Sequence, residues 1–93
     1  MTLSVADLAR ARETTAGLLD ELGLEAYFFD VEPHEGQWEL KVDCAMEPEG
    51  VWGSVTLWAP KEMLLTSQDD ASLRQRILAE WRAHLIACKR RAR

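Results

Sequence analysis

Four side chains of this sequence could bind a metal or attack a substrate: His34, Cys44, His84 and Cys88. Zinc accepts imidazole and thiolate ligands, and His84 and Cys88 are one helical turn apart. However, His34 falls in an expected turn, and no CxxC or similarly tight ligand spacing accompanies the set. We therefore expect no metal site and no cofactor.

The two cysteines are also weak candidates for covalent catalysis. Both fall on faces that should point into the core, where a thiol is unreactive and lacks an orienting group. A disulfide between Cys44 and Cys88 is geometrically feasible, but two cysteines are no disulfide framework, and we expect two buried free thiols. Since no Gly-rich phosphate loop or other mechanistic motif is present either, we expect that the protein is not an enzyme.

Length and composition predict one small domain over residues 1–93, with a basic C-terminal tail at 89–93. A chain of 93 residues, 47% hydrophobic and 29% charged, can build one core but not two. No apolar run approaches the roughly 18 residues of a membrane span. The N-terminus lacks the basic start and apolar centre of a signal peptide. We therefore expect a cytoplasmic protein with no membrane partner.

Charge is distributed unevenly along the chain. Residues 13–49 contain eleven carboxylates and a single base, Lys41, within a chain of net charge −5. Such a stretch repels phosphate and attracts a basic partner, although it also serves solubility alone. Residues 71–93 carry seven bases and one acid, Glu80. This basic end could bind nucleic acid, or could simply interact with the dipole of the helix that it ends.

Hydrophobic periodicity predicts the element order α-β-β-β-α. A helix over residues 4–22 begins with a capping-box-like Ser4 and stops before a glycine. Aromatic, β-branched and alternating residues predict strands over 24–31, 38–46 and 51–58. The two connections between these strands, Glu32-Pro33-His34-Glu35-Gly36 and Glu47-Pro48-Glu49-Gly50, are so similar that two successive hairpins follow.

The last third of the chain predicts a second long helix over about residues 68–90. Its start, Ser67-Gln68-Asp69-Asp70, resembles a capping box. Apolar residues then follow one helical face: Leu73, Ile77, Trp81, Leu85 and Cys88. Residues 61–66 are ambiguous between a helical turn and a buried connection, and we treat them as a loop.

These elements predict an α+β fold, a three-stranded antiparallel meander with two helices packed on one face. In strand 38–46 the apolar alternation from Trp38 to Cys44 should face the helices. In strand 24–31 we expect Tyr27 and Phe29 to point inward. In strand 51–58 the parity stays open: if the Val/Leu set points inward, Trp52 and Trp58 lie on the open face.

The open face of this sheet is the candidate binding site. Exposed aromatic side chains ringed by charge are typical of protein-binding hot spots. The residues expected there are Phe28, Asp30, Glu32, Glu39, Asp43, Trp52 and Trp58. Trp52 and Trp58 are about 20 Å apart along one strand, so they cannot form a single compact anchor. The segment 63–65 or a second copy of the protein could instead cover them.

We therefore expect a non-catalytic, small acidic binding protein, an adaptor or inhibitor of the immunity, antitoxin or phage-inhibitor type. Its partner would be a protein with a basic surface. The alternative partner is a second copy of this chain, in a homodimer through the open sheet face. The second function class is an RNA- or DNA-binding module that uses Arg74, Arg76, Arg82 and residues 89–93.

A comparison of topology bears on that second class. The element order is shared with double-stranded-RNA-binding domains, which meet phosphate with a basic start of the second helix. This sequence has Asp69 and Asp70 at that place. Acidic side chains there repel phosphate, which disfavours a nucleic-acid partner.

Overall fold

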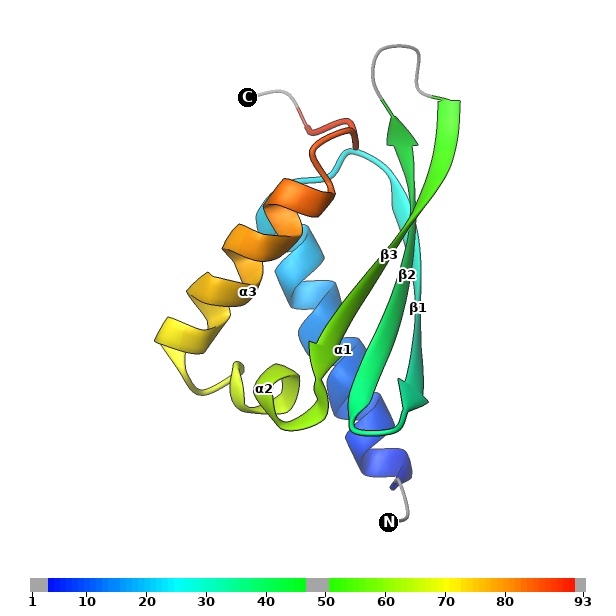
Figure 1. Ribbon diagram of the computed structural model, residues 1–93. Coiled ribbons are helices and arrows are strands. Elements are labelled where there is room, and N and C mark those ends of the chain that lie inside the picture. The colour runs from blue at the N-terminus through cyan, green and yellow to red at the C-terminus, as the bar shows by residue number, and fades with distance from the viewer. Residues whose placement is uncertain (1–3, 47–50, 92–93) are drawn as a thin grey trace.

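The computed structural model describes residues 4–46 and 51–91 and confirms the predicted α+β meander. The elements are α1 (Val5–Leu22), β1 (Tyr27–His34), β2 (Gln37–Met46), β3 (Val51–Pro60), α2 (Lys61–Thr66) and α3 (Ala71–His84). The strands form one antiparallel sheet in the order β1-β2-β3, and the helices lie on one side of it (Figure 1). Within the described ranges, no helix is long and apolar enough to cross a membrane. The second predicted turn, residues 47–50, lies outside the described residues.

Helix α1 has the boundaries that the sequence predicts. The Ser4 hydroxyl caps its first turn by accepting a hydrogen bond from the Asp7 backbone N–H at 3.0 Å. Gly23 ends the helix in the left-handed region, with φ of 77°, which costs glycine little because it has no Cβ.

Strand β1 runs about three residues later than expected, because the first turn is shorter than predicted. His34 pairs with Gln37, which leaves Glu35 and Gly36 as a two-residue hairpin loop. Gly36 has φ of 73°, a left-handed conformation that glycine adopts easily at the second central position of a turn. Pro33 was expected in the turn but lies within β1, where it is tolerated because β1 is an edge strand.

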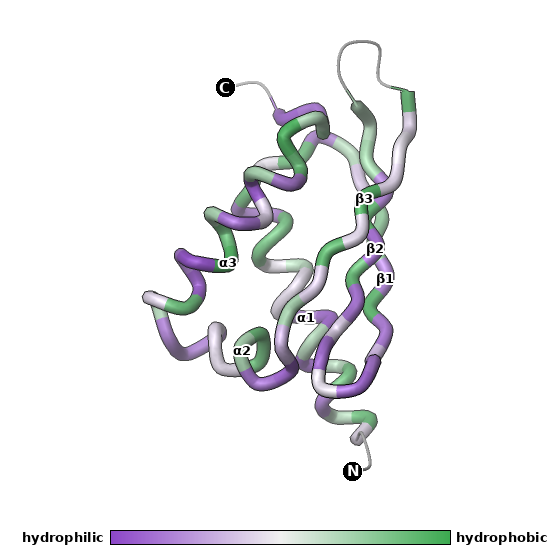
Figure 2. Tube along the Cα trace, in the orientation of Figure 1, coloured by the Kyte–Doolittle hydropathy of each residue, from purple (hydrophilic) through white to green (hydrophobic). Residues whose placement is uncertain are grey.

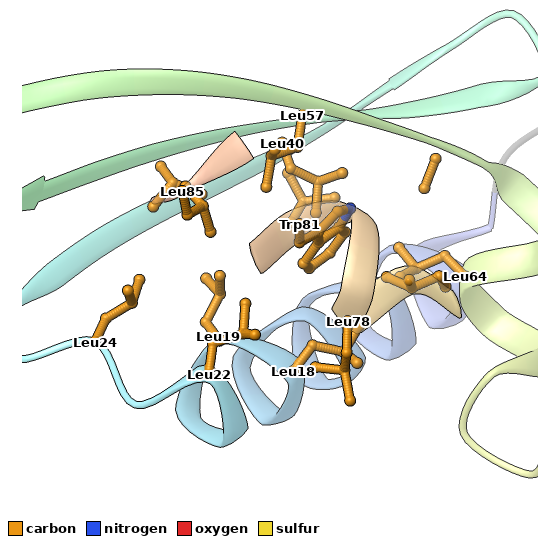
Figure 3. Close-up of a cluster of buried hydrophobic side chains, with 14 of the residues drawn as sticks. Leu18, Leu19, Leu22, Leu24, Leu40, Leu57, Leu64, Leu78, Trp81 and Leu85 are labelled. Carbon is orange, nitrogen blue, oxygen red and sulfur yellow. The ribbon is translucent and has the colours of Figure 1, made fainter. Parts of the chain in front are cut away.

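The core lies between the sheet and the helices. Inward residues of β2 alternate with outward polar ones, an alternation visible along the strands in Figure 2. Trp38 and Trp81 are the largest side chains that are fully buried. Figure 3 shows Trp81 among leucines from α1, the sheet and α3. Val31 is buried and Phe28 is exposed, as expected for β1. Leu57 is buried while Trp52 and Trp58 are exposed, which decides the parity of β3 that the sequence left open.

The predicted second helix over 68–90 was wrong at both ends, and the segment treated as a loop is the helix α2. Ser67 is buried after α2 and donates a hydrogen bond to the Leu64 carbonyl, so it caps no following helix. The N-cap of α3 is Asp70, whose carboxylate accepts from the Leu73 N–H. Helix α3 ends at His84.

Residues 85–91 then return to the sheet and do not extend α3. The Lys89 N–H donates to the Ala45 carbonyl at 2.7 Å, and its own carbonyl accepts from the Glu25 N–H at 2.9 Å. The Arg91 N–H donates to the Gly23 carbonyl at 2.7 Å. The last described residues therefore join the end of β2 to the segment between α1 and β1.

The expectation of two free thiols was also wrong. Cys44 on β2 and Cys88 beyond α3 form a disulfide, with their Cα atoms 5.7 Å apart. The return of the chain after His84 brings Cys88 against the sheet, which the predicted continuous helix did not anticipate. Sulfurs engaged in this bond neither ligate a metal nor act as nucleophiles.

Candidate functional site

The sheet brings all seven predicted site residues onto its open face, opposite the helices. The strand register pairs Phe28 with Asp43, and it aligns Glu32, Glu39 and Trp58 in one row across the three strands. Because side chains alternate across a strand, residues of these rows project from the same face. Asp30 and Trp52 belong to the same outward set.

An aromatic pair lies toward one end of this face. The rings of Phe28 on β1 and Trp52 on β3 stack with centroids 5.5 Å apart and an interplanar angle of 26°. Their exposed fractions are 68% and 50%, so the pair is open to solvent. With Asp43, Gly53 and Ser54 the two rings line a hollow of about 330 Å³. The sequence predicts both rings for this face but does not reveal their contact, because only the register shows that they meet across β2.

A second aromatic group lies at the other end of the face. Trp58 packs edge-on against the His34 imidazole, with ring centroids 5.5 Å apart. Nε2 of His34 is 3.0 Å from Oε1 of Glu39, within hydrogen-bond distance. Trp58 and His34 also line a hollow of about 680 Å³ with Glu35 and Gln37. The face thus has two separate aromatic groups, as the estimated distance of about 20 Å between Trp52 and Trp58 predicted. His34 was not among the binding residues predicted from the sequence.

The surface between the aromatic groups is acidic. Asp30, Glu32, Glu39 and Asp43 are opposed by one lysine of the same face, Lys41, which pairs in register with Asp30. Glu32 and Glu39 lie directly opposite each other, an arrangement that like charges disfavour. The Ser54 hydroxyl donates a hydrogen bond to the Asp43 carboxylate and orients it.

Three neighbouring side chains at the Trp58 end of the face carry atoms that can ligate a cation. One ligand atom each from Glu32, His34 and Glu39 lies within 4.8 Å of the others. The set is on the surface, and Nε2 of His34 already faces both carboxylates, at 3.8 Å from Glu32 and 3.0 Å from Glu39. We therefore assign it no metal.

Several basic residues of the alternative nucleic-acid surface are engaged with acidic groups. Nε of Arg74 is 3.1 Å from a carboxylate oxygen of Glu21 on α1. Lys89 and Arg91 approach the carboxylates of Glu25 and Asp20, each at 3.5 Å. These ion pairs reduce the positive potential available to a phosphate backbone. Arg76, Arg82 and Arg90 are exposed.

No family model, curated protein or solved structure matches this chain. Its function is therefore inferred from the open face itself.

Proposed function

We propose that this protein is a non-catalytic binding protein, an adaptor or inhibitor, whose open sheet face contacts a partner protein with a basic surface. The observation that carries the proposal is the presence of Phe28, Trp52 and Trp58 on one acidic face, with exposed fractions of 68%, 50% and 47%. Exposed aromatic side chains set among charged residues are typical of protein-binding surfaces, and large aromatic side chains contribute most to binding energy.

Charge selects the kind of partner. The carboxylates around the aromatic side chains attract a basic surface and repel phosphate, which speeds the encounter with one partner class and suppresses the other. The two aromatic groups supply short-range contacts at either end of the acidic strip. A partner that covers both would have to span about 20 Å, an ordinary dimension for a protein interface.

The test is affinity capture from a nuclease-treated native lysate, with the wild-type chain and two matched double variants. Phe28→Ala/Trp52→Ala removes the stacked pair from the face. The control, Val5→Ala/Ile86→Ala, removes two equally apolar exposed side chains, 86% and 74% exposed, from outside the sheet. Both variants should retain the circular dichroism spectrum and cooperative melting of the wild type.

We expect the wild type and the control to retain the same basic protein and the Phe28/Trp52 variant to lose it. The captured protein, once purified, should then bind the Phe28/Trp52 variant with a Kd at least tenfold higher than its Kd for the wild type. Equal binding by all three chains, or retention that occurs only in a parallel lysate without nuclease, would overturn the proposal. The latter result would favour the nucleic-acid alternative.

A further inference from the structure

Strand β3 is an unprotected edge of the sheet. It pairs with β2 on one side only, as the strand order β1-β2-β3 requires. Among the described residues, no backbone hydrogen bond joins β3 to a segment other than β2. Alternate N–H and C=O groups along its outer edge therefore lack a protein partner. In Figure 1, β3 passes in front of the other two strands, and no labelled helix or strand lies in front of it.

The two edge strands of the sheet differ in the residues that prevent pairing with a strand of another chain. Proteins usually protect an edge strand with charged residues or proline. Strand β1 has Asp30, Glu32 and Pro33. Strand β3 has no charged residue and no proline from Val51 to Ala59, a run of nine residues. This edge is suited to pair with another strand, whereas the β1 edge is not.

The order of residues along β3 is nearly the same in both directions. The run reads Val-Trp-Gly-Ser-Val-Thr-Leu-Trp-Ala, with Val55 at its centre. If two copies pair antiparallel about a two-fold axis at Val55, each Trp52 lies opposite Trp58 of the second copy. Each Ser54 then lies opposite a Thr56, and each Gly53 opposite a Leu57. Aromatic pairs and hydroxyl pairs are the cross-strand combinations that stabilise a sheet.

We infer that the outer edge of β3 pairs antiparallel with β3 of a second copy of this chain, about a two-fold axis at Val55. The result is a symmetric dimer with one continuous six-stranded sheet. A two-fold axis makes the contact self-complementary, and a strand without charges brings no like charges into direct opposition. This inference does not rest on the proposed function, because it is argued from the sheet edge, although the contact also uses Trp52 and Trp58 of the open face.

Burial on the inner side of β3 supports the same contact. Val42 on the central strand is fully buried, whereas its neighbour Val55 on β3 is only partly buried, and Val51 is 69% exposed. In the proposed pairing, Val55 contacts its own counterpart and Val51 lies opposite Ala59 of the second copy. The second chain thereby covers apolar surface that the helices of one copy leave accessible.

The register makes a specific prediction for cross-linking. Directly opposed residues in an antiparallel pair have Cα atoms about 4.5–5.5 Å apart, which suits a disulfide. Val55→Cys should therefore form a covalent dimer under mild oxidation. Val51→Cys is the matched control: it is the same substitution on the same strand, but its counterpart would lie about 27 Å away. It should remain uncross-linked.

Sedimentation velocity of the purified full chain tests the dimer without cross-linking. Ser54→Lys/Thr56→Lys places lysines opposite one another twice across the interface and should raise the dimer Kd about tenfold or more. Ala9→Lys/Gln75→Lys adds the same charge at exposed helix positions and should leave that Kd unchanged. Circular dichroism of each variant establishes that it is folded.

Three results would overturn the inference. The first is a wild-type chain that remains monomeric up to about 1 mM. The second is a dimer that the Ser54/Thr56 lysines do not weaken more than the control lysines do. The third is cross-linking of Val51→Cys to the same extent as Val55→Cys, which would mean a different register or interface. The proposed function is judged by a separate measurement, the binding of the wild-type chain to a basic partner, so failure of the dimer and failure of the proposed function are distinguishable.

Discussion

A disulfide joins Cys44 on β2 to Cys88, which lies four residues beyond the end of α3. The two cysteines are 44 positions apart in the sequence, and the bond closes the loop between them. Both side chains are buried in the core cluster, with exposed fractions of 0% and 3%. The bond fixes the returning C-terminal segment beside Ala45, where Lys89 forms its backbone hydrogen bond. The disulfide therefore ties the last described segment to the sheet.

Removal of this disulfide should destabilise the fold. In the chain-entropy model a loop of this length contributes about 4 kcal/mol, and native disulfides typically contribute about 2–5 kcal/mol. We expect Cys44→Ser/Cys88→Ser to lower the melting temperature by about 10 °C or more. Thermal melts of the wild type with and without reductant provide the comparison. If the double variant has the same melting temperature as the oxidised wild type, the disulfide contributes no stability.

A buried tryptophan, Trp81, and an exposed one, Trp58, should respond differently to truncation. Trp81 is 1% exposed and Trp58 is 47% exposed. Trp81→Ala leaves a cavity in the core and should cost about 3–5 kcal/mol of unfolding free energy. Trp58→Ala loses only half-exposed surface and should cost about 1 kcal/mol. Urea unfolding measures both values, and equal losses would contradict the assigned parity of β3.

Charge reversal on the open face should act on association with the basic partner. We expect Glu32→Lys/Asp43→Lys to slow association and to weaken its salt dependence, since exposed charges mainly steer the encounter. Both side chains are exposed, so the fold should be retained. The control Glu13→Lys/Glu80→Lys makes the same change on exposed helix positions. Stopped-flow rates at low and high salt should differ between the two variants, and identical rates would exclude the open face as the site.

Deletion of residues 89–93 should destabilise the protein, although the sequence suggests a dispensable basic tail. Residues 89–91 take part in three backbone hydrogen bonds, with Ala45, Glu25 and Gly23. At about 1 kcal/mol each, their loss should cost on the order of 2–3 kcal/mol. Chemical denaturation of the truncated chain tests this, and an unchanged midpoint would show that these bonds add nothing.

The positive charge of the same segment can be tested without removing its backbone. Lys89→Gln/Arg90→Gln keeps all three hydrogen bonds, because each uses a main-chain group. We expect its affinity for the basic partner protein to equal that of the wild type. The nucleic-acid alternative instead predicts a weaker affinity and a shallower salt dependence for an RNA or DNA oligonucleotide. Filter binding or fluorescence anisotropy separates these two outcomes.

The sequence by itself determined the meander and the inward face of its central strand. Strand side chains alternate with period two, so the apolar alternation around Leu40 fixed which residues of β2 point inward. The left-handed Gly23 and the Ser4 cap likewise fixed both ends of α1, because these signals act within one turn of the chain. Local periodicity and local capping are sufficient for such features.

Only the tertiary structure decided where the chain turns after His84 and which distant side chains meet. Apolar spacing continues from Trp81 through Leu85 to Cys88, and a helix or a returning segment can bury the same residues. The disulfide with Cys44 and the stacking of Phe28 on Trp52 both join residues far apart in the chain. Such contacts depend on strand register and on the packing of α3 against the sheet, and neither leaves a periodic signal in the sequence.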